Sequence, residues 1–239
     1  MRYLIQFSYD GSKFHGFQRQ NTVKSVQKSL EDALSKVLNT NIIVKGSGRT
    51  DAGVHALYQC AHFDYEKNLT KKDISKINNL LNREIIIKKY KKVNNDFHAR
   101  HSAKKKIYLY KIITKNYKDK YDGYFYQIKY PLDITIMKKA CKLFEGTHDF
   151  HNFVSGQRDN YKSHIYKIKI TKRKDIIYIK FIAKGFYRYM VRHLAGALID
   201  VGRGKTNFQE IKGMLDNPNI NKKLSILPAN GLYLVKVKY

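Results

Sequence analysis

The sequence predicts an α+β fold in which two ferredoxin-like halves share a continuous mixed, mainly antiparallel sheet. Apolar periodicity switches between strand and helix spacing in the order βαββαβ over the first half of the 239-residue chain. The second half repeats this theme of strands and helices without repeating the sequence, and no long linker separates the two. We therefore expect an N-terminal half over residues 1–102 and a C-terminal half over residues 103–239.

In the N-terminal half, alternating apolar residues predict strands and apolar residues at helical spacing predict helices. Thr70 followed by Asp73 resembles a helix start with a capping box. The expected elements, in order, are a strand Arg2–Tyr9, a helix over Val26–Leu38, strands Ile42–Ser47 and Leu57–Tyr65, a helix from Thr70 to Leu81, and a strand Ile85–Tyr90.

In the C-terminal half, Asp133 is a candidate helix N-cap and Gly146 a candidate helix stop. The expected elements are a strand Lys104–Thr114, a helix Asp133–Glu145, a hairpin over Ile165–Lys184, an apolar helix from Phe186 to about Val201, a short helix Asn207–Leu215 and a last strand Leu232–Val237.

The composition points to a polyanionic partner. Lys and Arg number 47 against 19 Asp and Glu, a net charge of +28, and 19 Tyr with 12 Phe offer stacking surfaces. The abundance of Lys, Asn, Ile and Tyr is typical of an AT-rich genome, which would account for part of the charge without a function. A solvated basic surface over an aromatic core is the alternative. Nucleic acid is the partner that the composition favours.

The location expected from the sequence is cytoplasmic. The first residues lack the apolar run of a signal peptide, and no stretch reaches the roughly 20 apolar residues of a membrane span. The two cysteines, Cys60 and Cys141, lie far apart and form no CxxC motif, so neither a disulfide framework nor a zinc site is expected.

The densest motif is Gly46-Ser-Gly-Arg-Thr-Asp-Ala-Gly-Val-His-Ala56, which joins two predicted strands that a much shorter turn could connect. Its glycines allow a ligand to approach the backbone, Arg49 offers a planar fork for phosphate or a base, and Asp51 offers a carboxylate. Because Asp and Gly are also ordinary turn formers, a loop that only closes a turn is the alternative.

Known cofactor motifs are missing from the sequence. A dinucleotide fingerprint would need glycine where Asp51 stands, and a P-loop ending at Thr206 would need glycine where Ile199 stands. The histidine pairs at a spacing of three, His98 with His101 and His148 with His151, lack a third ligand at a supporting distance. We therefore predict no metal site and neither of these two nucleotide-binding motifs.

Five segments resemble the TruA family of tRNA pseudouridine synthases, in the family's order and across nearly the whole chain. They are Tyr9-Asp-Gly-Ser-Lys-Phe-His-Gly-Phe-Gln-Arg-Gln20, Gly48-Arg-Thr-Asp-Ala-Gly-Val-His55, Asp96-Phe-His-Ala-Arg100, Met190-Val-Arg192 and Gly231-Leu-Tyr-Leu-Val235. The resemblance implies the pseudouridine synthase fold and isomerisation of uridine on the 3′ side of the tRNA anticodon stem-loop, at tRNA positions 38–40. It also implies a homodimer that needs no cofactor.

The resemblance implies that Asp51 is catalytic, as nucleophile or as base, and that Arg192 is its cationic partner. An arginine that reaches solvent from the helix edge is the alternative for Arg192. Tyr108 matches the family's base-stacking tyrosine; strand alternation places Tyr110 on the same side, and the family's register favours Tyr108. Leu234 matches a residue that forms an apolar wall of the family's pocket. A leucine that only packs in the core would give the same sequence pattern.

The resemblance also implies a set of substrate-binding residues. Arg49 is expected to help extrude the nucleotide from its stem. The segment from Asp10 to Gln20 is expected to contact RNA, with Phe17 where the family usually has tryptophan. The expected contacts are Ser12, Gln18, Arg19, Gln20, His98 and Arg100.

Two rival functions come from other classes. A non-catalytic RNA-binding or RNA-chaperone protein could be built on ferredoxin-like halves with aromatic strands, but it would not need the aspartate loop. A metal-dependent nuclease would need clustered acidic ligands, which the sequence lacks.

Overall fold

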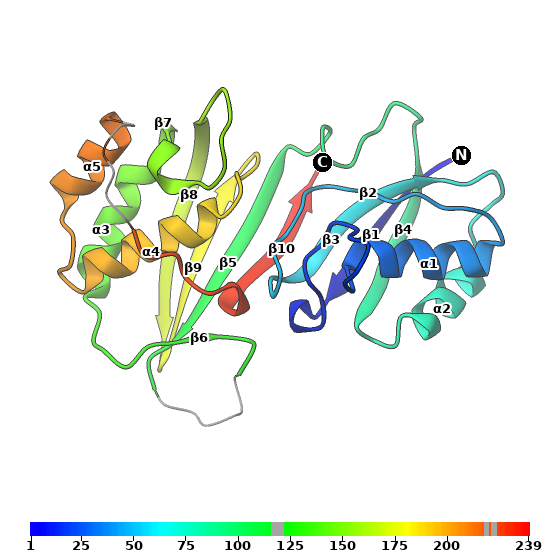
Figure 1. Ribbon diagram of the computed structural model, residues 1–239, viewed down its shortest axis with the longest axis horizontal. Helices are drawn as coiled ribbons and strands as arrows, with labels where there is room; N and C mark the ends of the chain where they lie inside the picture. Colours follow the sequence, from blue (N-terminus) through cyan, green and yellow to red (C-terminus); the bar gives the residue numbers. More distant parts are fainter. Residues whose placement is uncertain (116–121, 218–219, 221–223) are drawn as a thin grey trace. The chain divides into compact units, whose positions relative to one another are not determined.

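The computed structural model describes residues 1–115, 122–217, 220 and 224–239. The chain forms two compact units: unit 1 comprises Met1–Lys104 with Tyr233–Tyr239, and unit 2 comprises Lys105–Leu232. The fold class is α+β with mixed, mostly antiparallel strand pairing, as predicted (Figure 1). The C-terminal strand, expected in the second half, belongs to unit 1 because it pairs with a strand there.

The sheet of unit 1 has the order β4-β1-β3-β10. Its strands are β1 (Arg2–Tyr9), β2 (Lys45–Gly46), β3 (His55–Asp64), β4 (Ile85–Val93) and β10 (Leu232–Lys238). β1 is antiparallel to both β3 and β4, and β2 is antiparallel to β3. β10 is parallel to β3, with Tyr233 opposite His55 and Leu234 opposite Ala56.

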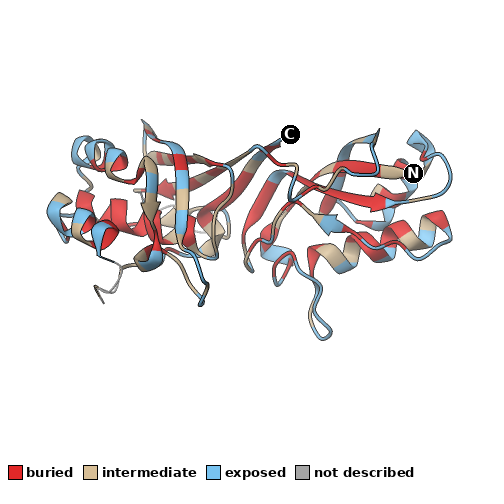
Figure 2. Ribbon diagram, turned by 90° about the horizontal axis from the view of Figure 1, so that it is seen from above, coloured by how far each residue is buried: buried red, intermediate tan, exposed pale blue. Residues whose placement is uncertain are grey.

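Helices α1 (Val26–Leu38) and α2 (Lys71–Leu80) pack against each other beside this sheet (Figure 1). The predicted capping box of α2 is present: Thr70 Oγ1 accepts a hydrogen bond from Asp73 N at 3.2 Å, and Thr70 N donates to the Asp73 carboxylate at 2.9 Å. Buried residues run along the strands and the inner sides of the helices (Figure 2). The strands and helices of unit 1 therefore follow the predicted βαββαβ order.

The predicted strand Ile42–Ser47 is wrong in its extent, because only Lys45–Gly46 pairs as β2. Ile42 N donates instead to Ser35 Oγ at 2.9 Å, and Val44 N donates to Glu31 Oε1 at 2.9 Å. Side chains of α1 thus accept hydrogen bonds from the two backbone N–H groups that a longer strand would use for pairing. Residues 42–44 therefore lead from α1 into β2, and the loop that follows begins after β2.

The sheet of unit 2 has the order β5-β9-β8-β7, with neighbours antiparallel. Its strands are β5 (Lys105–Ile113), β6 (Tyr126–Gln127), β7 (Gly146–Asp149), β8 (Lys162–Arg173) and β9 (Ile176–Ala183), and β6 pairs with β5 in parallel. The predicted hairpin is therefore β8–β9. The short strands β6 and β7 were not predicted, since two to four residues carry too little periodicity to read.

Three α-helices follow in the described part of unit 2: α3 (Ile134–Phe144), α4 (Met190–Gly202) and α5 (Phe208–Asp216). α3 packs on β8 and on α4, and α5 packs on α3 and β7. Short 3₁₀ turns lie at Gly11–Lys13 in unit 1 and at His151–Phe153 and Ala229–Gly231 in unit 2. Among the described residues, no helix has the length and apolar character that a membrane span requires.

Helix α4 begins at Met190, four residues after the predicted start at Phe186. Tyr189 has φ 60°, a left-handed conformation that is costly for a residue with a side chain and that interrupts helical geometry. Beyond it, every residue of α4 is buried except Arg192. The helix is thus a core element with one cationic side chain near its start.

Candidate active site

The loop between β2 and β3, residues 47–54, carries Asp51 and is called the aspartate loop below. Its anchors come from the strands beneath it. The Tyr9 hydroxyl lies 2.8 Å from Thr50 Oγ1, and the fully buried Gln59 donates from Nε2 to Gly48 O at 3.1 Å. Val54 N donates to Asp51 O at 3.2 Å, which closes a turn on the aspartate itself. The half-buried Asp51 therefore stands on a backbone fixed on both sides.

The segment 10–20 forms a backbone support for the aspartate loop. Phe17 N donates to Thr50 O at 3.0 Å, and Gly53 N donates to Phe14 O at 3.5 Å. A Cβ at Gly11 would lie 2.2 Å from Val54 O, and Gly16, with φ +97°, would place a Cβ 3.0 Å from Thr50 O. The glycines of this segment are required by the close approach of two backbones.

His55, at the end of the aspartate loop, is a structural residue that sequence reasoning did not single out. Its buried ring stacks on Tyr233 of β10 with 4.6 Å between centroids, and its Nδ1 accepts from Gly11 N at 3.1 Å. Asp10 Oδ1 lies 3.3 Å from the same Nδ1. The motif contained His55, but nothing in the spacing indicated its packing against the C-terminal strand.

The predicted RNA-contacting residues of segment 10–20 are exposed, and several also make contacts within the protein. Ser12 Oγ donates to Asp10 Oδ1 at 2.7 Å, and Gln20 Nε2 donates to His15 O at 2.9 Å. Arg19 forms an ion pair with Glu31, and Gln18 is exposed. These contacts tie the segment to itself and to helix α1.

Phe17, where the family usually has tryptophan, is 4% exposed. Its ring covers Gly46, where an added Cβ would lie 2.4 Å from the ring. Phe17 is therefore a packing residue beneath the aspartate loop. The departure from the family pattern at this position falls in the protein interior.

His98 and Arg100 lie after β4 in unit 1, and Arg100 is exposed. His98 Nδ1 accepts from Arg100 N at 3.1 Å, and its ring lies 4.7 Å from that of His62. His62 is 1% exposed; burial first, and the neighbouring His98 second, lower the pKa of His62 to about 4. Across the ranges that the structure describes, no three His, Cys, Asp or Glu side chains gather as metal ligands.

Tyr108 and Tyr110 on β5 of unit 2 have different surroundings, although strand alternation places them on the same side. Tyr110 is fully buried; its hydroxyl donates to Pro228 O at 2.7 Å, and burial raises its pKa. Tyr108 is 8% exposed and meets Phe186 edge to face, with 5.3 Å between centroids. The Tyr110 hydroxyl thus has a structural role, which leaves Tyr108 as the stronger candidate for base stacking.

Arg192 is held by the segment 224–228, which we call the strap. Its Nε donates to Leu227 O at 2.6 Å, and Leu227 N donates to Arg192 O at 3.4 Å. The guanidinium carbon lies 4.7 Å from the Tyr189 ring centroid. These contacts orient the plane of the guanidinium, so Arg192 is not an arginine that merely extends into solvent.

The strap lies directly on α4. A Cβ at Gly196 would lie 1.8 Å from Ser225 O, and the buried Asp200 accepts from Ser225 N at 3.4 Å and Ser225 Oγ at 3.2 Å. The sequence analysis did not single out Gly196 or Asp200. An acidic residue within an otherwise apolar helix was the available signal for Asp200, because a buried carboxylate needs a partner.

The candidate site residues divide between the two units. Unit 2 carries Tyr108 and Arg192. Leu234, in unit 1, is 1% exposed on β10 opposite Ala56, whereas Arg49 is exposed on the aspartate loop. The remaining candidates, all in unit 1, are Asp51, Ser12, Gln18, Arg19, Gln20, His98 and Arg100.

Comparison with known proteins identifies the family. A family model described as tRNA pseudouridine synthase matches residues 5–102 and 140–239. Proteins named tRNA pseudouridine synthase A are similar over most of their length. That of Thermosipho africanus is 40% identical, covering 100% of this chain and 99% of the relative. That of Mycoplasmoides gallisepticum is 38% identical, covering 99% and 90%. The chain therefore belongs to the family of tRNA pseudouridine synthases, isomerases that convert uridine in tRNA to pseudouridine.

Proposed function

We propose that this protein isomerises uridines on the 3′ side of the tRNA anticodon stem-loop, at tRNA positions 38–40, with Asp51 as the catalytic residue. We further propose that it acts in the cytoplasm as a homodimer without a cofactor. The observation that carries the catalytic assignment is the fixed backbone around Asp51, which is hydrogen-bonded through Thr50 and closed by Val54. A loop that served only as a turn would not need support from both the sheet and segment 10–20.

The reaction accounts for a single essential carboxylate. Forming pseudouridine breaks the bond between N1 and C1′, turns the uracil, and joins C5 to C1′, while C5 loses a proton and N1 gains one. Product and substrate are isomers, so no electron acceptor or hydrolytic water is consumed. An ionised Asp51 could attack C1′ as nucleophile or remove a ribose proton as base, and holding it in a fixed geometry supports either role.

Arg192 and Tyr108 complete the proposed catalytic set. The bond from Arg192 Nε to Leu227 O fixes the orientation of the guanidinium. We propose that it keeps the catalytic carboxylate ionised. Tyr108 would stack on the target base, and Leu234 would supply an apolar wall.

The exposed residues around Asp51 suit the handling of RNA. A base in a stem must leave its stack before chemistry, at a cost of a few kcal/mol that protein contacts offset. Arg49, exposed two residues before Asp51, is proposed to assist this step. Phosphate contacts by Ser12, Gln18, Gln20, His98 and Arg100 would add to the attraction of a chain with net charge +28.

Mapping pseudouridine in tRNA from a strain that lacks the protein tests the substrate assignment. We expect loss of pseudouridine confined to the anticodon arm, restored by the wild-type protein. Purified protein should likewise act on anticodon stem-loops that carry a single uridine at position 38, 39 or 40. Loss in another arm, or no activity on these stem-loops, would contradict the proposal.

A further inference from the structure

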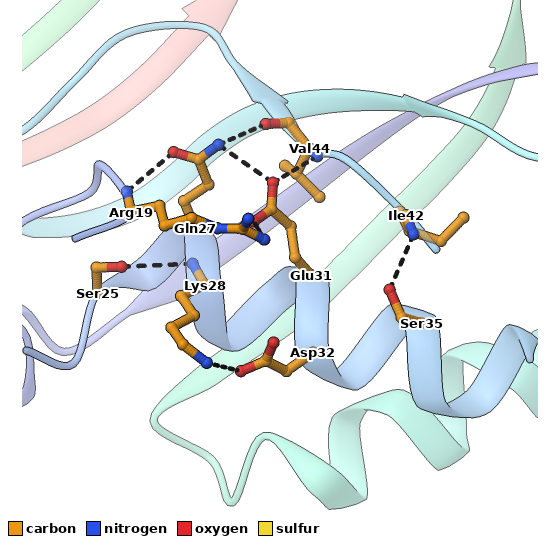
Figure 3. Close-up of polar contacts among 9 residues, drawn as sticks. All are labelled: Arg19, Ser25, Gln27, Lys28, Glu31, Asp32, Ser35, Ile42 and Val44. Carbon is orange, nitrogen blue, oxygen red and sulfur yellow. Dashed lines mark hydrogen bonds and ion pairs between the residues drawn. The ribbon is translucent and has the colours of Figure 1, made fainter. Parts of the chain in front are cut away.

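Glu31 is a buried carboxylate in the middle of α1, with 2% of the residue exposed. Its Oε1 accepts from Val44 N at 2.9 Å and from Gln27 Nε2 at 3.2 Å, and its Oε2 lies 2.5 Å from Arg19 Nη2 (Figure 3). The contact with Arg19 is an ion pair without the geometry of a directed hydrogen bond. A carboxylate removed from water in this way needs such partners to remain charged.

Gln27, one turn earlier on α1, extends this contact into a network. Its Oε1 accepts from Arg19 N at 3.0 Å, and its Nε2 donates to Val44 O at 3.1 Å (Figure 3). The network therefore joins three separate segments: the end of segment 10–20, helix α1, and the residue before β2.

Two short routes lead from this network to Asp51. Through Val44, it fixes the chain that enters β2 and the aspartate loop. Through Phe17, whose carbonyl accepts from Gln27 N at 2.9 Å and whose N donates to Thr50 O at 3.0 Å, it reaches the residue before Asp51. The Phe17 ring also covers Gly46, so both routes meet at the base of the loop.

We propose that Arg19 and Glu31 form a positioning pair that sets the aspartate loop, so that Arg19 acts on catalysis through Asp51 and not as an RNA ligand. This inference rests on the proposed catalytic role of Asp51. It replaces the expectation that Arg19 binds the substrate. The side chain of Arg19 is 51% exposed and that of Glu31 only 3%, so the arginine covers the carboxylate from the solvent side.

Three variants test the pair: Arg19→Ala, Glu31→Gln and the double variant. Arg19→Ala leaves a buried carboxylate without its cation, so we expect kcat on an anticodon stem-loop to fall by roughly tenfold or more, because small misplacements of reacting groups are costly. Glu31→Gln keeps an acceptor for Val44 N and should lower kcat less. The double variant removes the uncompensated charge and should recover part of the kcat that Arg19→Ala loses.

The affinity for tRNA distinguishes positioning from RNA binding. We expect the dissociation constant and its salt dependence to stay near wild type in Arg19→Ala. A lost phosphate contact would instead weaken binding and reduce the slope of log K against log salt by about 0.7 to 0.9. That result, with kcat unchanged, would overturn the proposal.

Helix α1 supplies matched controls. Lys28 and Asp32 form an exposed pair at 2.7 Å on the same helix, with side chains 47% and 60% exposed (Figure 3). Lys28→Ala and Asp32→Asn make the same changes of charge without touching the network and should leave kcat unchanged. If Arg19→Ala lowers only the melting temperature, or if the double variant recovers stability but not kcat, the pair is merely structural and the proposal fails.

Asp51→Asn, measured in the same assay, separates this inference from the proposed function. If Asp51→Asn is inactive while Arg19→Ala changes only binding, the positioning role is wrong and the catalytic assignment stands. If Asp51→Asn stays active, the proposed function itself fails.

Discussion

The aspartate loop of unit 1 and the Arg192 region of unit 2 hold their candidate residues by different means. The loop is fixed by hydrogen bonds with Tyr9, Gln59 and Phe17. Gly11 and Gly16 let the backbone of segment 10–20 come close to that of the loop. Arg192 stands on a helix whose other residues are all buried. Hydrogen bonds set geometry with a modest net contribution to stability, whereas apolar burial dominates stability. Changes at the loop should therefore affect activity first, and changes under α4 should affect both activity and folding.

Gly11→Ala should have the largest effect on activity among the changes that spare the site residues. Its Cβ would lie 2.2 Å from Val54 O, so the aspartate loop or segment 10–20 must move. A displacement near 1 Å can cost about 100-fold in rate, and we expect a loss of that order in kcat. Gly213→Ala in α5, where an added Cβ meets only Ile220 at 3.6 Å, is the control and should keep its rate. Wild-type kcat in Gly11→Ala would show that the loop is not held in this way.

Gly196→Ala makes the matching change in unit 2. Alanine favours a helix over glycine by up to about 1 kcal/mol, yet here the Cβ would lie 1.8 Å from Ser225 O and displace the strap. Because the strap also orients Arg192 through Leu227, we expect both the melting temperature and kcat to fall. A melting temperature above that of wild type would contradict the packing of the strap on α4.

Tyr110→Phe and Tyr108→Phe compare two neighbours on one strand. Tyr110→Phe loses the bond to Pro228 O and should reduce the free energy of unfolding by about 1 kcal/mol. Tyr108→Phe keeps a ring that can stack, so tRNA binding should be retained, while turnover falls if the hydroxyl takes part. Urea unfolding measures the free energy of unfolding of both variants, and tritium release measures their turnover. Equal losses in the free energy of unfolding would contradict a structural role that belongs to the Tyr110 hydroxyl and not to that of Tyr108.

Each unit contains a buried histidine that should make stability depend on pH. Burial lowers the pKa of both His62 in unit 1 and His193 in unit 2 to about 4. An unfolded chain has histidines near pKa 6.5, so between these values the unfolded state binds more protons than the folded state. Stability should be fully present above pH 6.5 and fall as the pH drops toward 4. His193→Gln should weaken the pH dependence of the urea midpoint across this range and leave the share that His62 contributes; an unchanged profile would contradict the buried neutral state of His193.

The sequence predicted the helices and long strands because their apolar periods are clear over many residues. It failed where side chains redirect the backbone: Ser35 and Glu31 take the amides of Ile42 and Val44, which shortens β2 to two residues. Tyr189 delays the start of α4 through a left-handed conformation that no local pattern announces. The pairing of β10 with β3 places Tyr233 opposite His55, and such long-range partners leave no local signal.

The candidate site was predicted through motif resemblance, and the roles of its residues remain predictions. The structure adds the residues that support it, including His55, Asp200 and Glu31, because their importance comes from contacts across long stretches of sequence. Arg19 illustrates the limit of reading one motif alone: the motif does not indicate that the arginine forms an ion pair with Glu31, which lies twelve residues later on a helix.

The measurement that tests the account most directly is tritium release from C5-labelled uridine in an anticodon stem-loop by Asp51→Asn, with tRNA affinity measured alongside. Asparagine preserves the shape and turn propensity of Asp51 but removes its charge and its capacity as nucleophile or base. We predict a folded variant that binds tRNA near normally and releases essentially no tritium. Release at even a tenth of the wild-type rate, about 1.4 kcal/mol of barrier, would contradict Asp51 as the catalytic group.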